Sequence, residues 1–266
     1  NVTPYHQTVE DNVIHRVVEE LEASSDYQAR RKAILDFNRT STVLKKGIAL
    51  TPVKFGISFT ATWYNQEGAL VHVYKDGSIH LSHGGTEMGQ GLYIKVAQVV
   101  ADAFGVNLDT VKIMATSTGK VPNTSATAAS SGSDLNGMAA WDACEQIKRR
   151  LEAHAAKLYD VDVSQCQWVQ GGLQAGGTFI PFAELAASAY LNRVQLSAAF
   201  YKTPKIHWDR ATGRGRPFYY FAYGASVSEV TIDTLTGEYT VDRVDILHDV
   251  GKSLHPAIDI GQVEGG

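Results

Sequence analysis

The sequence predicts an α+β protein in which largely antiparallel β-hairpins pack with helices. Apolar residues alternate on both sides of turn-forming segments at residues 75–78 and 234–238, a pattern typical of hairpins. Residues 9–22, 90–104 and 134–157 instead repeat their apolar residues at helical spacing. Because strands and helices are mixed with hairpins along the chain, the class is α+β rather than all-α or all-β.

In the N-terminal third, the apolar pattern predicts two helices, a strand and a hairpin, in that order. Helical spacing covers residues 9–22 and again residues 26–38, and apolar alternation then covers residues 45–60. Residues 68–83 predict a hairpin, in which the Asp76-Gly77 dipeptide is a signal of a type I′ turn.

The middle of the chain predicts two helices separated by a strand and a loop. The first helix covers residues 90–104 and ends at Gly105, a residue type that favours helix C-termini. A strand is expected over residues 109–115. Residues 116–133 are rich in Thr, Ser, Ala and Gly, and they lead into a helix from Asp134.

The C-terminal third predicts two further hairpins around a helix. A short hairpin is expected over residues 164–180, a helix over residues 182–191 and a strand over residues 194–201. Residues 202–217 are polar and predict a loop. The long hairpin of residues 218–249 follows.

The bulk composition is that of an ordinary globular protein. The chain has 266 residues, enough for one large domain or two small ones, with 44% hydrophobic and 20% charged residues. The net charge of −4 does not favour binding to nucleic acid or to an anionic membrane, because both are negatively charged. No apolar run reaches the ~20 residues of a membrane helix, and no signal peptide precedes residue 1. No nucleic-acid partner and no membrane partner are therefore expected.

Cysteine usage excludes several kinds of site. The two cysteines, Cys144 and Cys166, cannot form a disulfide framework, an iron–sulfur cluster or a four-Cys zinc site. A reducing cytoplasm is the expected location. The sequence has no initiator Met and stops at residues 261–266, where a helix is expected to begin, so we interpret it as a piece of a larger protein.

A glycine-rich stretch at residues 83–91 (HGGTEMGQG) joins the first hairpin to a helix. In a strand–turn–helix arrangement of this kind, backbone N–H groups and the positive end of the helix can face an anionic group. The spacing matches neither the dinucleotide fingerprint nor the phosphate loop. Without further observations, a tight structural turn is the favoured interpretation of this stretch.

Small hydroxyl residues in residues 116–133 offer a second set of donors. A run of Ser and Thr that leads into a helix N-terminus can present several N–H and O–H groups to one anion. The alternative is a flexible small-residue loop with a Ser N-cap. The stretch alone does not decide between them.

The two long hairpins repeat one pattern. Each is followed by a loop and a Gly-Gln pair, at Gly89-Gln90 and at Gly261-Gln262. We interpret the repeat as two similar αβ subdomains that face a shared cleft, with chance similarity as the alternative. The expected division is residues 1–42 as a helical lead-in, residues 43–193 as the first half and residues 194–266 as a truncated second half.

Four segments together resemble the molybdopterin-binding region of the xanthine dehydrogenase/xanthine oxidase family. They occur in the family's order and at its separations: residues 54–60 (KFGISFT), 83–91, 121–133 (VPNTSATAASSGS) and 259–265 (DIGQVEG). The similarity extends over nearly the whole chain. One glycine-rich turn would be weak support, whereas four collinear motifs are specific.

The resemblance implies which residues bind the cofactor and the substrate. The implied cofactor-binding residues are Met88, Gly89, Gln90, Ala129, Ser130, Ser133 and Gln262. The implied substrate-binding residues are Phe59, Thr60, Ala128 and Ala129. The residue types agree with these roles, because a phosphate needs N–H donors and small residues, and a flat purine needs an aromatic face such as Phe59. From the alternating pattern alone, Phe59 would be a core residue.

The resemblance also implies the reaction, the oxidation of hypoxanthine and xanthine to urate. In this family a molybdenum-bound hydroxyl attacks the purine, hydride passes to a molybdenum-bound sulfur and a glutamate takes the proton. The motifs with that glutamate and with the substrate-orienting arginine lie outside residues 1–266, so no catalytic residue is expected here. We interpret Glu87 as a loop-stabilising carboxylate, Glu264 as a first-turn helix residue and His83 as a hydrogen-bonding turn residue.

The implied cofactors lie partly outside this segment. Molybdenum is held by the pterin dithiolene, so no protein metal ligand is expected, and the nine histidines are scattered without metal-ligand spacing. A 2Fe-2S centre, FAD and NAD belong to other domains. The segment alone is expected to bind no cofactor and to be inactive.

The expected partners are a purine substrate and the remaining domains or subunits of a parent enzyme. The parent enzyme is expected to be dimeric or a dimer of heteromers. Two alternatives remain: a segment of an aldehyde oxidase, which shares the Gly-Gln loops, and a non-catalytic assembly domain whose Gly/Ser loops are merely turns.

Overall fold

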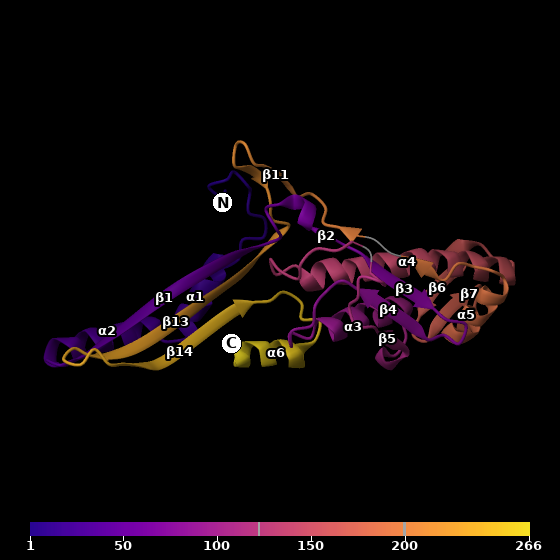
Figure 1. Ribbon diagram of the computed structural model, residues 1–266. Helices are drawn as coiled ribbons and strands as arrows, with labels where there is room; N and C mark the ends of the chain where they lie inside the picture. Colours follow the sequence, from indigo (N-terminus) through magenta and orange to yellow (C-terminus); the bar gives the residue numbers. More distant parts are fainter. Residues whose placement is uncertain (122, 199–200) are drawn as a thin grey trace. The chain divides into compact units, whose positions relative to one another are not determined.

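The computed structural model describes residues 1–121, 123–198 and 201–266 (Figure 1). It confirms the α+β class, since helices alternate with sheets in which β4–β5 is the one parallel pair among the described strands. The helices are α1 (Ile14–Ser24), α2 (Tyr27–Thr40), α3 (Leu92–Phe104), α4 (Gly132–Tyr159), α5 (Phe182–Leu191) and α6 (Pro256–Gly265). None of the helices in the described part of the chain is both long and apolar enough to cross a bilayer.

Contacts group the chain into two compact units. Unit 1 comprises residues 1–57 and 209–252, and unit 2 comprises residues 58–208 and 253–266. This grouping does not follow the expected boundaries after residues 42 and 193, which stay a prediction, as does the shared cleft between two halves. Every residue predicted to bind cofactor or substrate lies in unit 2.

Unit 1 is a three-stranded antiparallel sheet covered by two helices. The sheet has the order β1-β13-β14, formed by β1 (Leu44–Ile57), β13 (Tyr220–Asp233) and β14 (Tyr239–Asp249). Helices α1 and α2 lie along one face of it (Figure 1). Val17 and Leu21 of α1 are buried there because they pack on Ala225 and Val227 of β13.

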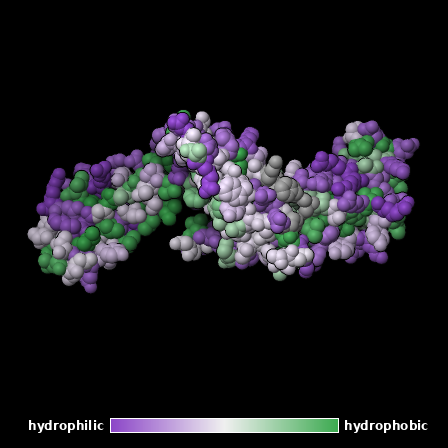
Figure 2. All heavy atoms as spheres, turned by 45° about the horizontal axis from the view of Figure 1, so that its top comes forward, coloured by the Kyte–Doolittle hydropathy of each residue, from purple (hydrophilic) through white to green (hydrophobic). Residues whose placement is uncertain are grey.

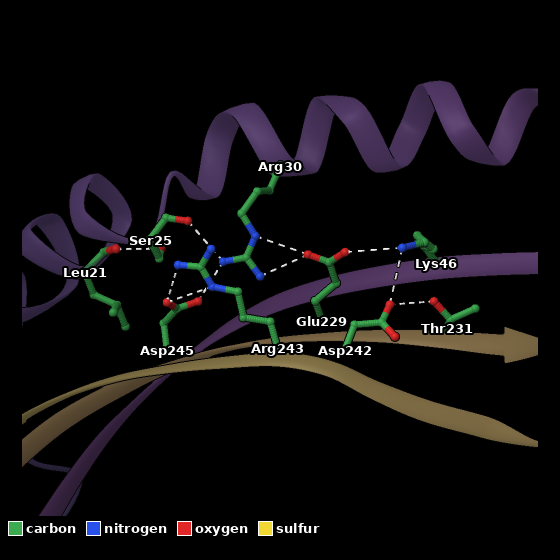
Figure 3. A network of polar contacts seen from close by, with 9 residues as sticks. All are labelled: Leu21, Ser25, Arg30, Lys46, Glu229, Thr231, Asp242, Arg243 and Asp245. Carbon is green, nitrogen blue, oxygen red and sulfur yellow. Dashed lines mark hydrogen bonds and ion pairs between the residues drawn. The ribbon is translucent and has the colours of Figure 1, made fainter.

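A polar network fastens α2 to this sheet (Figure 3). The Arg30 guanidinium binds the carboxylates of Glu229 on β13, at 3.0 Å, and Asp245 on β14, at 2.7 Å. Arg243 binds the other oxygen of Asp245, and Lys46 lies between Glu229 and Asp242. Only 14% of the Arg30 side chain is exposed, so its charge depends on these partners.

Unit 2 is built on a four-stranded sheet covered by α3 and α4. Its order is β5-β4-β3-β9, formed by β3 (Ala69–Val73), β4 (Ile79–His83), β5 (Val111–Ile113) and β9 (Ser197–Ala198). Ala139, Ala140 and Ala143 of α4 are fully buried, and such small side chains let helices approach closely. The predicted α3 ends as expected at Gly105, which has a positive φ of 65°.

Smaller sheets and single-turn helices complete the chain. The strands of the smaller sheets are β2 (Gln66–Glu67) with β10 (Tyr201–Lys202), β11 (His207–Asp209) with β12 (Arg214–Arg216), and β6 (Cys166–Val169), β7 (Gly172–Ala175) and β8 (Thr178–Pro181). The 3₁₀ turns are η1 (Thr62–Tyr64), η2 (Leu108–Thr110) and η3 (Val163–Gln165).

Two predictions for the stretch after α5 were wrong. Residues 202–217 do not form a plain polar loop, because β11 and β12 pair there as a hairpin. The strand predicted over residues 194–201 is shorter, since β9 covers only Ser197–Ala198, and residues 199–200 lie outside the described residues. The polar side chains of this stretch gave no strand pattern in the sequence. The hairpin forms nevertheless, because strands pair through backbone N–H and C=O groups that every sequence has.

Two further predictions differ in detail. The turn of the β3–β4 hairpin is not type I′, because that type needs two central residues with positive φ and only Gly77 has one, at 84°. The C-terminal helix begins at Pro256, five residues before the predicted Gly261, since Pro is well suited to the first helical turn. Gln262 therefore lies inside α6 and not at its start.

Candidate functional site

The glycine loop, residues 84–91 between β4 and α3, is organised by the Glu87 carboxylate. Its two oxygens accept from the backbone N–H groups of Gly89 at 2.8 Å, Gly91 at 3.0 Å and Tyr93 at 3.0 Å. Burial raises the pKa of the Glu87 carboxyl, but these N–H groups outweigh it and leave the pKa below its usual value. Glu87 is therefore the loop-stabilising carboxylate that the sequence predicts. Its charge, rather than that of a ligand, occupies the N-terminus of α3.

Gln90 closes the same loop with its side-chain amide. Its Oε1 accepts from the Met88 N–H at 2.6 Å, and its Nε2 donates to the Thr86 carbonyl at 2.8 Å. Met88 is 68% exposed, and a Cβ at Gly89 would meet nothing within 4 Å. The tip of the glycine loop, residues 88–89, is thus open to solvent while Gln90 holds its shape.

His83 lies beneath the glycine loop and is fully buried. Its Nδ1 accepts from the Gly85 N–H at 3.1 Å, and its ring meets Tyr93 edge-on. Burial lowers the pKa of His83 to about 4, against the opposite effects of Asn136 and Glu87. His83 thus makes the expected hydrogen bond, but it is the last residue of β4 and not a turn residue.

The serine loop, residues 123–131, packs on the glycine loop. The Thr127 hydroxyl accepts from the Thr86 N–H at 2.9 Å. A Cβ at Gly84 would lie 2.3 Å from the Thr124 hydroxyl oxygen, so only glycine allows this approach. The two motifs, forty residues apart in sequence, form one surface.

Two residues of the serine loop have the left-handed backbone conformation that side chains rarely adopt. Ala129 has φ of 56° and Ser130 has φ of 55°. Such successive turns direct backbone groups to one side, and strain of this kind is typical of ligand sites. Ala128 and Ser130 are exposed, whereas Ala129 is half-buried.

Helix α4 begins directly after this strained pair. Ser131 is its N-cap residue, but its hydroxyl donates to the Ala128 carbonyl at 3.0 Å and does not cap the helix. The acidic Asp134 lies in the first turn of the helix. Ser133 lies in the first turn, half-buried. The serine loop therefore leads directly into the N-terminus of α4, the end of a helix at which backbone N–H groups can bind an anion.

The Phe59 segment, residues 58–65, directly follows β1. Phe59 lies outside the strand, since β1 ends at Ile57, and it is half-buried rather than a core residue. The Asn65 side chain fixes it by accepting from the Phe59 N–H and donating to the Phe59 carbonyl, both at 2.8 Å. Its ring lies 5.5 Å from that of Tyr64, and Thr60 beside it is exposed.

Two further contacts connect the predicted residues. The Ser58 N–H donates to the Ala129 carbonyl at 3.4 Å, which places the Phe59 segment beside the serine loop. The Gln262 side chain of α6 donates to the Gly89 carbonyl at 3.3 Å. An ion pair of 2.6 Å between Lys95 on α3 and Asp259 on α6 holds that helix in place.

Several residues of the site were missed by sequence reasoning. Fully buried Asn136 of α4 accepts from the Gly85 N–H at 2.9 Å and so joins α4 to the glycine loop. Asn65 and Tyr64 contact Phe59, and Trp63 contacts Tyr64. Trp63 and Tyr64 are about half exposed. A cluster of aromatic residues just after a strand was the available signal for them.

Glu67 is the least expected member of this region. It lies on β2 and is 2% exposed, and its Oε2 finds no partner among the described residues. Burial raises the pKa of Glu67 to about 7, against the lowering effect of a hydrogen bond from the Ser125 backbone. The buried Glu67 carboxyl therefore contacts the serine loop through this hydrogen bond.

The described residues contain no group of three or more His, Cys, Asp or Glu side chains arranged to hold a metal ion. The open tip of the glycine loop, the strained serine loop before α4 and the exposed aromatic rings instead suit a large, partly anionic organic group. The chain belongs to the molybdopterin cofactor-binding domain family, whose profile matches residues 20–266.

Its relatives are xanthine dehydrogenases, which confirms the predicted resemblance. The chain is 48% identical to the xanthine dehydrogenase of Oryza sativa subsp. japonica and 47% identical to the xanthine dehydrogenase/oxidase of Mus musculus. Each comparison covers 100% of this chain and 18% of the relative, so the chain spans less than a fifth of their length.

Solved structures share the fold. The quinoline 2-oxidoreductase of Pseudomonas putida 86 superposes with a TM-score of 0.81 at 20% identity, covering 100% of this chain and 34% of that one. The CO dehydrogenase of Oligotropha carboxidovorans gives the same TM-score at 22% identity, again covering 100% and 34%. At these identities the likeness concerns the fold alone.

Proposed function

We propose that this chain is the molybdopterin-binding part of a molybdenum hydroxylase that oxidises hypoxanthine and xanthine to urate. The observation that carries the proposal is the meeting of the glycine loop, the serine loop, the Phe59 segment and Gln262 in one unit. The identity of 48% with a xanthine dehydrogenase over the whole chain supports the purine substrate.

The residues present fit the cofactor. Backbone N–H groups of Ser130 and Ser133, at the start of α4, suit the terminal phosphate of the pterin. The open tip at Met88 and Gly89 allows close approach of the pterin ring, with the amides of Gln90 and Gln262 beside it. When bound, molybdopterin supplies the dithiolene-held molybdenum at which the substrate is hydroxylated.

The substrate would lie against the other side of the serine loop. Half-buried Phe59 offers its ring to the flat purine, and Asn65 holds the backbone of Phe59 rigid. Thr60, Ala128 and Ala129 would border the purine edge, where small side chains leave room for it.

The proton acceptor would come from outside residues 1–266. Glu87 already accepts three backbone N–H groups, and His83 is buried with a pKa lowered to about 4. Neither is placed to take a proton from a substrate at neutral pH. The parent enzyme would also supply the 2Fe-2S centre, FAD and NAD that carry the electrons away.

The experiment is a Gln90→Ala substitution in the full-length parent enzyme, with molybdenum content and xanthine kinetics measured. Loss of the two hydrogen bonds of Gln90 should destabilise the tip of the glycine loop by about 1–3 kcal/mol, and molybdenum per protomer should fall. The KM for xanthine of the loaded fraction should not change.

The matched control is Gln174→Ala, which removes an exposed glutamine from β7 in the same unit. It should retain its molybdenum. If Gln90→Ala keeps its full molybdenum content but has a raised KM for xanthine, Gln90 contacts the substrate and not the cofactor. Absence of molybdenum from the parent protein would favour the alternative of a non-catalytic assembly domain. Oxidation of aldehydes in preference to xanthine would favour the aldehyde oxidase alternative.

A further inference from the structure

The sheet of unit 1 has one covered face and one open face. Successive residues of a strand point to opposite faces, and directly paired residues share a face. The pair Leu50–Val227 lies under α1 and α2. The adjacent pairs, such as Thr51–Ser226 and Ser226–Ile246, therefore point to the other side.

Large apolar side chains gather on this open face. Seven of them are between 42% and 71% exposed: Val53, Phe55, Ile232, Tyr239, Val241, Val244 and Ile246. They come from all three strands and are linked by register, as in the pairs Val230–Val241 and Ile232–Tyr239. A green band runs along the unit at the left of Figure 2.

Charge is distributed unevenly between the two faces. The charged residues of the Figure 3 network, Lys46, Glu229, Asp242, Arg243 and Asp245, bind one another or Arg30 of α2 on the covered side. On the open side the register leaves Lys45 and His248 as the basic residues, and no Asp or Glu of the three strands points there. The Lys45 ammonium donates to the carbonyls of Asn38 and Ser41 on the helix side.

A face of this kind requires a partner. Soluble proteins rarely expose contiguous apolar patches of more than a few hundred Å², and larger patches mark interaction surfaces. A face almost without charge resembles the core of a permanent interface, whereas transient interfaces are as polar as the rest of the surface. Burial of the seven side chains would add the apolar contact that a three-stranded sheet with one covered face lacks.

We propose that the open face of the β1-β13-β14 sheet is a permanent docking surface for another, apolar part of the same parent polypeptide. The relatives place this chain in proteins more than five times its length, since it spans 18% of them, so ample chain is present to cover the face. This role is independent of the cofactor, because all the proposed cofactor residues belong to unit 2.

Hydroxyl-radical footprinting of the intact parent protein tests the docking surface. The labelling rate of each side chain is compared between the native and the urea-unfolded protein. Tyr239, Val244 and Ile246 should be protected as strongly as Val227, which is fully buried within the unit. Protection no greater than that of Leu235, which is 80% exposed in the adjoining turn, would overturn the proposal.

Dilution of the parent protein separates the two sources of an apolar partner. Protection that persists on dilution supports a docked part of the same polypeptide. Protection that disappears on dilution would assign the face to a second copy and overturn the proposal.

A pair of substitutions on one hairpin gives an independent readout. Ile246→Asp should lower the melting temperature of the parent protein by several degrees, because it places a charge in a buried contact. Leu235→Asp introduces the same charge at an exposed position outside the open face and should leave the melting temperature unchanged. Equal melting temperatures for Ile246→Asp and the wild type would refute the docking surface.

Discussion

Glu67 makes the stability of unit 2 dependent on pH, and Glu67→Gln should remove that dependence. The carboxyl is buried under the serine loop, with its pKa raised from 4.5 to about 7. Between these two pH values, Glu67 is protonated in the folded state and ionised in the unfolded state. Since the folded state binds more protons, the free energy of unfolding falls as the pH rises from 4.5 to 7.

The size of this effect follows from the shift. Each pKa unit corresponds to about 1.4 kcal/mol, so the full contribution is about 3 kcal/mol. A neutral amide of the same shape replaces the protonated acid at low pH with little change. Glu67→Gln should thus match the wild type near pH 4.5 and exceed it by about 2–3 kcal/mol above pH 7.

His83 opposes Glu67 within part of the same pH range. Its pKa is lowered from 6.5 to about 4, so it contributes stability above pH 6.5 that is lost as the pH falls toward 4. The wild-type profile alone mixes the two groups. The difference between the variant and the wild type isolates Glu67, because His83 is present in both proteins.

The assay is urea unfolding followed by tryptophan fluorescence at pH 5, 6, 7 and 8. All four tryptophans, at positions 63, 141, 168 and 208, belong to unit 2, so the signal reports that unit. Glu238→Gln, at an exposed position between β13 and β14, serves as the control and should show no such difference. A constant difference between Glu67→Gln and the wild type across these pH values would refute a raised pKa for Glu67.

Two other substitutions test how each unit is held together. Arg30→Met leaves the carboxylates of its network without their guanidinium and should destabilise unit 1 by about 2–4 kcal/mol, whereas Arg16→Met, in an exposed helix pair, should have a much smaller effect. Thermal unfolding followed by circular dichroism would measure both, and equal effects would contradict the role of the network. Gly91→Ala places a Cβ 2.7 Å from Ile258 of α6 and should make α6 easier to cleave in limited proteolysis. Gly237→Ala, with a similar φ of 79° and open space, should not, and equal cleavage would contradict the packing of α6 on the glycine loop.

Local patterns in the sequence determined most of the elements. Apolar spacing located α1 through α5, and turn residues located the two long hairpins, because both signals depend on neighbours within a few residues. The motifs at Phe59, at the glycine and serine loops and at Gln262 were collinear with those of the xanthine dehydrogenase family. The family was therefore readable from the sequence.

Only the tertiary structure decided how these pieces meet. It placed Gln262 in the same unit as Gln90, and it made Glu87 the cap of α3. It buried Glu67 and left Ile246 exposed, although hydropathy predicts the reverse. These outcomes depend on contacts between residues tens to hundreds of positions apart, whose burial and charge no local pattern of the sequence contains.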